Sequence, residues 1–461
     1  FIFSWSDHVK EIFLICNRLY LELGGLPRVV LTKANKFIEM GYKVTILTVD
    51  FSMDYRYISK ELKKTNQLLS DVNFINLYNF YEDKSINFGK GFLSIFENFF
   101  NNIRLREMGL PLRKHKNVIV KRYNAPNGFC YYIELFVKNK LKCRFLIDRE
   151  KNKIFKFKNE DMINKHFFLE LANKCKEKPI FICEGAGPTP KISNIDKNIA
   201  YLISQLHSNP YQGKHEFGEK MRKIGVLNKI ENNNVFVVLT KTQKKDIIKA
   251  FGNFDNLIAI PNSIPESNLL GVEKDNNKIS LFTRISPEKN ILEAINIFAK
   301  VLKKKPNAIL EIYGRASKNL PYEVKELKKV KKHIKKLNLE RSIFIKGYIE
   351  DVNRAMEESL ATILTSKKEG FGMVIIESMY NATPVISYDI SYGPSDIIDH
   401  GVNGFLVEKN NQDEMVKYII KLLDNPKKAK KMGKNARKKV SENYTNKVIF
   451  PKWKQLFKKL E

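Results

Sequence analysis

The sequence predicts an α/β protein of two doubly wound domains, with an antiparallel β segment inserted into the first. Three observations indicate this: the length, the alternation of apolar strands with helical patterns, and a single all-β interruption. A chain of 461 residues is longer than one hydrophobic core usually serves, so two domains are expected.

The first fifty residues predict a strand–helix–strand unit. The apolar run EIFLIC (11–16) is typical of a strand, and KVTILTV (43–49) of the next one. Between them, Gly24 and Gly25 allow a tight turn, and apolar residues then recur at helical spacing as far as Gly41. We expect a right-handed parallel crossover.

The pattern changes between about residues 80 and 170. Segments 118–137 and 141–158 are rich in β-branched and aromatic residues, and turn residues interrupt them at 126–128 and 148–152. Such segments predict antiparallel hairpins. We interpret this region as a module inserted into the first domain.

The second half repeats the alternation of strands and helices. Strands are predicted at 278–284, 308–314, 342–348, 361–366 and 383–389. The last twelve residues place four apolar side chains on one helical face, which favours packing onto a domain over lying on an anionic membrane. The expected domain boundaries are 1–79 with 171–255 for the first domain, 80–170 for the insertion, 256–445 for the second domain, and 446–461 for a helix crossing back to the first.

Composition narrows the class of partner and the compartment. The formal net charge is +31, which favours a polyanion such as nucleic acid, anionic lipid or a phosphate-bearing polymer. An AT-rich coding sequence, which inflates lysine everywhere, is the alternative. No apolar run is long enough to span a membrane and no signal peptide is recognised, although the chain starts at Phe1. Five scattered cysteines indicate reduced thiols in a cytosolic protein.

The segment RISPEK predicts an anion site. Arg284 ends a strand, Ser286 can cap a helix, Pro287 suits its first position, and Lys289 then lies in the first turn. Cations are unfavourable beside a positive helix N-terminus unless an anion such as pyrophosphate lies between them. The alternative is two solvated charges.

The segment EGFGMVIIE places two carboxylates after the next-to-last predicted strand. Glu369 lies in a loop, Gly370 and Gly372 allow close backbone approach, and a helix starting near Met373 carries Glu377 one turn later. Both acids lie at the carboxyl edge of the sheet, where such folds bind ligands. Sugar hydroxyls are suitable partners, because a phosphate would be repelled.

These motifs resemble retaining glycosyltransferases of the GT-B fold, in particular glycosyltransferase family 4. EGFGMVIIE matches their E-x7-E motif, RISPEK their diphosphate clamp, IPNSI (260–264) the start of their second domain, and GGLPRVV their N-terminal glycine loop. More narrowly, segments 388–407, 183–191 and 206–209 and the β insertion resemble bacterial wall-teichoic-acid α-glycosyltransferases. That group covers poly(glycerol phosphate) α-glucosyltransferases and poly(ribitol phosphate) α-N-acetylglucosaminyltransferases.

The resemblance implies a role for each matching residue. Arg284 and Lys289 would hold the donor diphosphate, and Glu377 the ribose hydroxyls. The catalytic residues would be Glu369, which orients the donor sugar, and His207, which contacts it. The remaining donor-binding residues would be Gly370, Phe371, Gly372 and Met373, through their backbone, and Gly24 and Gly25 near the phosphate or acceptor. There is no Asp-x-Asp in the chain, which agrees with metal-independent transfer in this family, and no cofactor is implied beyond the co-substrate UDP-sugar.

The leading hypothesis is transfer of a hexose, glucose or N-acetylglucosamine, from a UDP-sugar to a polyol-phosphate polymer such as wall teichoic acid. Alternatives are the same chemistry on a capsule polysaccharide, lipid-linked glycan or serine-rich protein, a nucleic-acid-binding protein, or a noncatalytic scaffold. The enzyme would be cytoplasmic, with peripheral contact at the inner face of an anionic membrane. The insertion would build a homo-oligomer or bind the acceptor.

Overall fold

The computed structural model describes residues 10–21, 24–51, 54–87, 105, 108, 117–185, 189–209, 227 and 229–460. Contacts divide the chain into two compact units, residues 1–205 with 225–236 and residues 206–224 with 237–461. Segment 237–255, which the sequence interpretation gave to the first domain, is therefore counted with the second unit. Its helix α8 (Lys241–Phe251) bonds within that unit, since the Thr242 hydroxyl donates to Asp396 Oδ1 at 2.9 Å.

A parallel sheet forms the centre of the first unit. The strand order is β11–β10–β9–β8–β1–β2–β3, with β11 and the end of β10 counted in the second unit. The strands are β1 (Glu11–Cys16), β2 (Lys43–Thr48), β3 (Asn73–Asn76), β8 (Ile180–Glu184), β9 (Tyr201–Leu206), β10 (Val235–Val238) and β11 (Leu257–Ala259). Helix α1 (Gly25–Glu39) connects β1 to β2, which pair in parallel. The predicted strand–helix–strand unit is confirmed.

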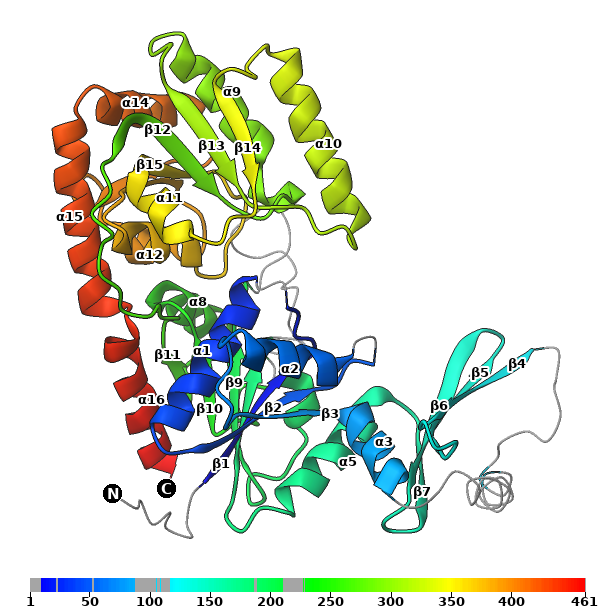
Figure 1. Ribbon diagram of the computed structural model, residues 1–461. Coiled ribbons are helices and arrows are strands. Elements are labelled where there is room, and N and C mark those ends of the chain that lie inside the picture. The colour runs from blue at the N-terminus through cyan, green and yellow to red at the C-terminus, as the bar shows by residue number, and fades with distance from the viewer. Residues whose placement is uncertain are drawn as a thin grey trace. The chain divides into compact units, whose positions relative to one another are not determined.

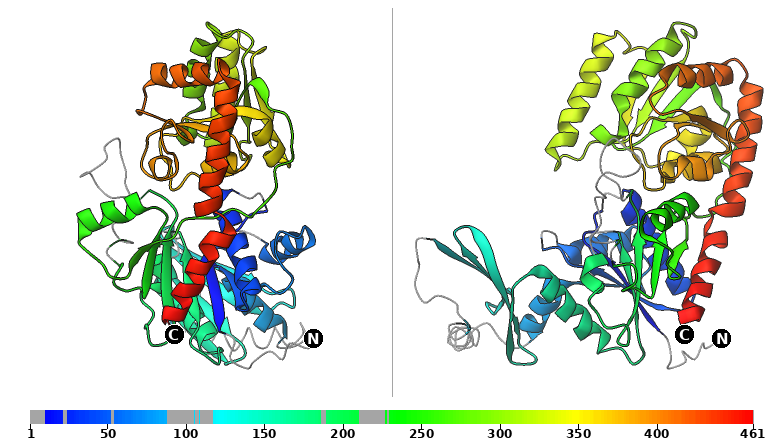
Figure 2. Two further views of the ribbon diagram at one scale, coloured as in Figure 1. Left: turned by 90° about the vertical axis from the view of Figure 1, so that its left-hand side faces the viewer. Right: turned by 180° about the vertical axis from the view of Figure 1, so that it is seen from behind.

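The insertion is a four-stranded antiparallel sheet in the order β4–β5–β6–β7, as the hairpin patterns predicted. Its strands are β4 (Val118–Asn124), β5 (Cys130–Val137), β6 (Lys140–Asp148) and β7 (Lys153–Phe157). It packs against α3 (Leu77–Asn87) and α5 (Glu160–Ala172), as Figures 1 and 2 show. Buried Lys84 of α3 bonds Asp148 at the end of β6 and Glu170 of α5. This ion cluster joins the insertion to the rest of the first unit. The first unit also contains α2 (Tyr55–Lys64) and α6 (Thr189–Ile192).

The second unit is built on a six-stranded parallel sheet in the order β14–β13–β12–β15–β16–β17. Its strands are β12 (Asp275–Phe282), β13 (Ile309–Tyr313), β14 (Ile343–Gly347), β15 (Ser359–Leu364), β16 (Val385–Tyr388) and β17 (Gly404–Val407). The five predicted strands are confirmed, and the short edge strand β17 was not predicted. Its helices are α9 (Ile291–Leu302), α10 (Pro321–Lys336), α11 (Val352–Glu358), α12 (Met373–Tyr380), α13 (Pro394–Ile397), α14 (Gln412–Leu423), α15 (Pro426–Asn443) and α16 (Asn446–Leu460).

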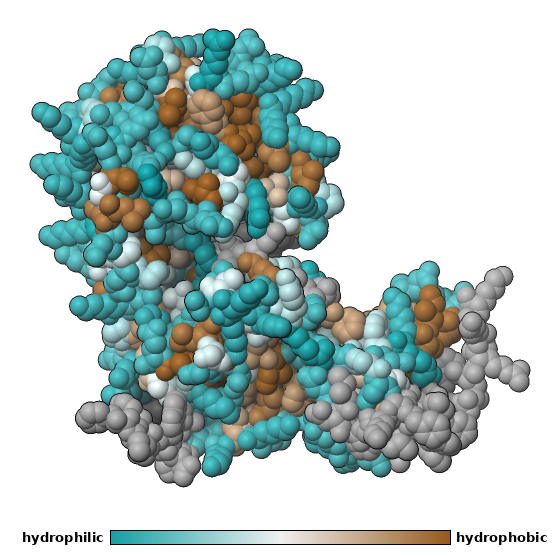
Figure 3. Space-filling model, viewed as in Figure 1, coloured by the Kyte–Doolittle hydropathy of each residue, from teal (hydrophilic) through white to brown (hydrophobic). Residues whose placement is uncertain are grey.

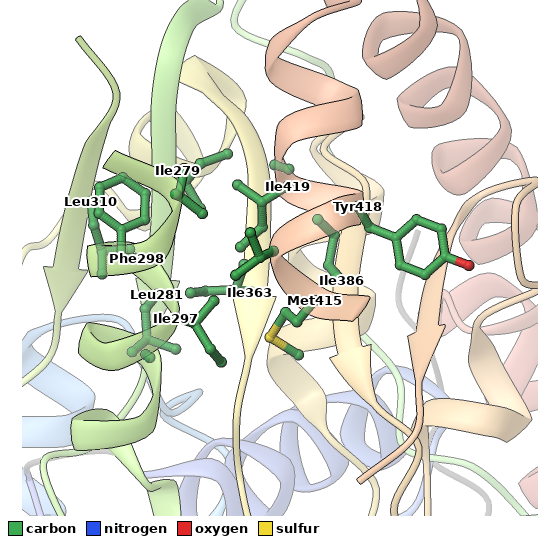
Figure 4. Close-up of a cluster of buried hydrophobic side chains, with 14 of the residues drawn as sticks. Ile279, Leu281, Ile297, Phe298, Leu310, Ile363, Ile386, Met415, Tyr418 and Ile419 are labelled. Carbon is green, nitrogen blue, oxygen red and sulfur yellow. The ribbon is translucent and has the colours of Figure 1, made fainter. Parts of the chain in front are cut away.

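The core of the second unit lies between this sheet and two of its helices. Ile297 and Phe298 of α9 and Met415 of α14 pack against Ile363 and Ile386 on the central strands, as Figure 4 shows. All five side chains are 0% exposed. This packing fixes the strands whose carboxyl ends carry the site residues of this unit.

The final helix also has a buried face, as the apolar spacing predicted. Phe450, Trp453 and Phe457 of α16 are 6%, 1% and 0% exposed. That this helix crosses back to the first domain stays a prediction. No helix in the described part of the chain is long and apolar enough to cross a membrane. Figure 3 shows hydrophilic side chains over most of the viewed surface of the second unit, in keeping with the lysine content of the sequence.

Candidate active site

The predicted clamp and the predicted acidic loop meet at one edge of the second sheet. Strands β12 and β15 pair in parallel, so the segments that follow them start side by side. Lys367 N donates to Glu288 O at 2.9 Å, and the Thr365 hydroxyl contacts Lys289 O at 3.3 Å. These bonds hold segment 286–290 against segment 365–372, and the two motifs form one site.

Lys289 and Glu369 form an ion pair at the centre of this site. Lys289 Nζ lies 2.6 Å from Glu369 Oε1, and the two side chains are 21% and 11% exposed. A charge-assisted hydrogen bond of this length is strong. The sequence interpretation assigned these residues to the diphosphate and to the donor sugar, and the structure shows that they also bond each other.

Arg284 is also paired with carboxylates. Its Nη2 lies 2.8 Å from Glu288 Oε1 and its Nε lies 3.2 Å from Glu323 Oε1. Glu323, in the first turn of α10, is fully buried and accepts the backbone N–H of Ser317 at 2.8 Å. Burial raises the pKa of the Glu288 carboxyl, but hydrogen bonding by a backbone N–H and by Arg284 outweighs this effect, and the pKa is lowered. The side chain of Arg284 is 52% exposed, so it can reach a ligand.

The predicted helix start at this site is wrong. Residues Pro287–Lys289 form a single 3-10 turn, and Asn290 follows in the left-handed conformation with φ 53°. Helix α9 begins only at Ile291, and Ser286 makes no capping hydrogen bond to the turn. Asparagine tolerates this conformation better than most residues, so the helical conformation is interrupted at Asn290. Lys289 therefore lies in the turn before the helix.

Gly370 brings the acidic loop against His207. A Cβ atom added to Gly370 would lie 2.1 Å from His207 O, so the two backbones touch and only glycine fits. His207 directly follows β9 and is half-buried. The structure thus places His207, Gly370, Glu369 and Lys289 together within the second unit.

Helix α12 begins at the remaining residues of the motif. Gly372 adopts φ 83° and caps the helix, and half-buried Met373 is its first residue. The Phe371 side chain is 3% exposed and packs edge-on against Tyr444, with 5.9 Å between ring centroids. Phe371 can therefore meet a ligand only through its backbone. Glu377 lies one turn into α12 and is half-buried.

The glycine loop lies in the first unit. Gly24 caps α1 and Gly25 is its first residue. A Cβ atom at either position would have no atom within 4 Å, so packing does not require glycine there. Two residues of the site, Glu288 and Glu323, were not predicted; Glu288 lies inside the clamp motif, whereas no local pattern connects Glu323 with Arg284.

Comparisons with known proteins find related sequences. Residues 265–439 match the family described as Glycosyl transferases group 1. The chain is 28% identical to the poly(ribitol-phosphate) alpha-N-acetylglucosaminyltransferase of Staphylococcus aureus, over 97% of this chain and 100% of that protein. It is 25% identical to the poly(glycerol-phosphate) alpha-glucosyltransferase of Bacillus subtilis, over 65% of this chain and 43% of that protein.

A solved structure extends the likeness to the whole fold. The crystal structure of TarM has a TM-score of 0.77 and 24% sequence identity, covering 98% of this chain and 99% of that chain. The chain therefore has the GT-B fold, and its residues 265–439 are similar to the glycosyl transferases group 1 family.

Proposed function

We propose that this protein is a hexosyltransferase that moves glucose or N-acetylglucosamine from a UDP-sugar to a polyol-phosphate polymer such as wall teichoic acid, with retention and without a metal ion. The observation that carries the proposal is the pairing of Lys289 with Glu369 beside Arg284. Two cations for a diphosphate and one carboxylate for a sugar are the groups that a nucleotide sugar needs. The two polyol-phosphate glycosyltransferases of similar sequence support this acceptor class.

Donor binding exchanges the partners of these charges. Lys289 and Arg284 turn from Glu369 and Glu288 to the diphosphate, where they stabilise the charge of the leaving UDP. The released Glu369 carboxylate accepts a hydrogen bond from a hydroxyl of the donor sugar. One binding event thus both neutralises the diphosphate and orients the sugar.

Transfer then exchanges one bond at the anomeric carbon. The bond from C1 to the β-phosphate oxygen breaks, and a bond from C1 to the acceptor oxygen forms on the same face. The acceptor proton passes to the leaving phosphate oxygen, which keeps atoms and charge balanced. His207 and the backbone of Gly370 and Gly372 line the sugar, and Glu377 accepts from the ribose hydroxyls.

The test combines a donor screen with an acceptor comparison. Labelled UDP-glucose and UDP-N-acetylglucosamine are each offered with a polyol-phosphate polymer and with a neutral polysaccharide. We expect label from one donor to enter the polyol phosphate. Label entering only the polysaccharide, or a serine-rich protein, would refute the polyol-phosphate acceptor. It would not refute hexose transfer from a UDP-sugar.

Two variants test the site. Lys289→Ala should lower kcat/KM about 10²–10³-fold, as for loss of one transition-state charge contact. Lys300→Ala is the matched control, because Lys300 also pairs with a carboxylate, Asp413, at 2.8 Å and lies on the exposed surface. Equal turnover in the two variants would refute the assignment.

A further inference from the structure

The first unit has an exposed aromatic ring that neighbouring rings hold in place. Phe51, which follows β2, is 41% exposed. Its ring centroid lies 4.6 Å from those of Tyr78 and Tyr123, both edge-on, and 6.1 Å from that of Tyr132. Tyr123 and Tyr132 come from strands β4 and β5 of the insertion, and both hydroxyls donate to Glu134. The insertion therefore fixes an apolar ring at the surface.

An ion pair lies next to this ring. Arg18, after β1, donates from Nε to Asp50 Oδ2 at 2.8 Å, and the two side chains are 50% and 19% exposed. Asn76 Nδ2 donates to Asp50 O at 3.0 Å, which fixes the loop that carries Asp50 and Phe51. Guanidinium and carboxylate together offer donors for a phosphate and acceptors for hydroxyl groups.

A buried hydroxyl in the segment after β2 has no hydrogen-bond partner among the described residues. Tyr55, in the first turn of α2, is 1% exposed, and within the described residues its hydroxyl forms no hydrogen bond. Burial raises its pKa most, and the charges of Asp50, Cys16, Tyr20 and Arg18 act on it next. Arg18 and Asp50 are thus among the groups whose charges act on this hydroxyl. An unpaired buried hydroxyl is costly, and a ligand that draws Arg18 away from Asp50 would let the Asp50 carboxylate accept from it.

We propose that Arg18, Asp50, Phe51 and Tyr55 form a binding site for one polyol-phosphate repeat of the acceptor, an inference that rests on the proposed function. Arg18 follows β1, and Asp50, Phe51 and Tyr55 follow β2. The carboxyl ends of parallel strands form the ligand-binding edge of such sheets. The donor clamp belongs to the second unit, so this edge is available for the other substrate.

Each group has a defined partner in such a repeat. The Arg18 guanidinium binds the phosphate, the Asp50 carboxylate accepts from polyol hydroxyls, and the Phe51 ring covers the carbon chain. When Arg18 turns to the phosphate, the Tyr55 hydroxyl donates to the Asp50 carboxylate. A repeat that combines anion, hydroxyls and carbon chain uses all four groups, whereas inorganic phosphate uses only Arg18.

The experiment uses the full chain at saturating UDP-sugar and varies the acceptor polymer. Phe51→Ala and Arg18→Gln should each raise the acceptor KM about tenfold or more, the effect of one lost charged or stacking contact. UDP release without acceptor should change less than about twofold. Tyr57→Ala and Arg354→Gln are matched controls, because Tyr57 is 54% exposed and Arg354 also pairs with a carboxylate; both should keep the acceptor KM.

Tyr55→Phe separates binding from folding. Removing an unpaired buried hydroxyl should keep or raise Tm, while the acceptor KM rises severalfold. An unchanged acceptor KM in Phe51→Ala and Arg18→Gln would overturn the inference, as would a parallel loss of UDP release. Competition by inorganic phosphate as strong as by a free polyol phosphate would also overturn it. Failure of the unmodified protein to transfer to any polyol phosphate would instead overturn the proposed function.

Discussion

Replacing Gly370 with alanine tests whether its contact with His207 serves catalysis. The added Cβ would lie 2.1 Å from His207 O and 2.9 Å from Ser208 Cα, where real Cβ atoms stay beyond 3.0 Å. The 207–208 segment must therefore retreat by about 1 Å, and a displacement of that size at a reacting centre can cost about 10²-fold in rate. Overpacking of this kind should also lower the free energy of unfolding by about 1–3 kcal/mol.

Gly433→Ala provides the matched control. Its Cβ would lie 2.0 Å from Ala382 O, the same kind of clash in the same unit, but between α15 and the residues after the C-terminal end of α12, opposite the end at Gly372. Urea unfolding and kcat with saturating donor and acceptor are measured for both variants. We expect similar losses of stability and a fall in kcat, corrected for the folded fraction, only for Gly370→Ala. Equal kcat in the two folded variants would refute the reasoning.

Three further predictions concern stability and reactivity. Phe371→Ala should lower the free energy of unfolding by about 3–5 kcal/mol in urea titrations, because the ring belongs to the core; full stability with lost activity would contradict this. Burial raises the pKa of Glu170, but bonds led by that from Lys84 lower it to about 2. The contribution of this carboxylate to the free energy of unfolding is therefore fully present above the unfolded pKa and falls by roughly 3 kcal/mol as pH drops to about 2. Glu170→Gln should flatten the acid side of a plot of unfolding free energy against pH, and an unchanged acid side would contradict the role of Glu170. Burial and the Glu184 charge raise the pKa of the Cys16 thiol to about 12, so a thiol reagent should label Cys16 only on unfolding, and rapid labelling of the native protein would contradict the burial.

Local sequence patterns were enough to predict the sheets. Strands such as β1, β2 and β15 are continuous apolar runs, and buried parallel strands have this composition. The four antiparallel strands of the insertion were equally visible, because turn residues separate them. The clamp and acidic loop could be brought together because both follow strands of one parallel sheet.

The details of the site depend on contacts that local patterns do not encode. Asn290 gives no sign in the sequence that it breaks the helix, since its left-handed conformation follows from how the 3-10 turn meets α9. The pairing of Arg284 with Glu323 joins residues on separate elements. Tyr55 and Phe51 belong to no motif, and only the fold shows that an unpaired hydroxyl and an exposed ring lie at the same edge. The predicted domain boundaries and the roles of the site residues stay predictions.

The ion pairs of Lys289 and Arg284 have a consequence for selectivity. An enzyme acting on a polyphosphate works in a high local concentration of phosphodiester groups, each of which carries a single negative charge. Glu369 and Glu288 are tethered to their cations and so compete at a high effective concentration. A single phosphodiester group gains too little binding free energy to displace these carboxylates from Lys289 and Arg284. A nucleotide sugar also contributes a second phosphate and a sugar to binding. Under the proposed function, the internal carboxylates would thereby protect the donor site from inhibition by the acceptor polymer.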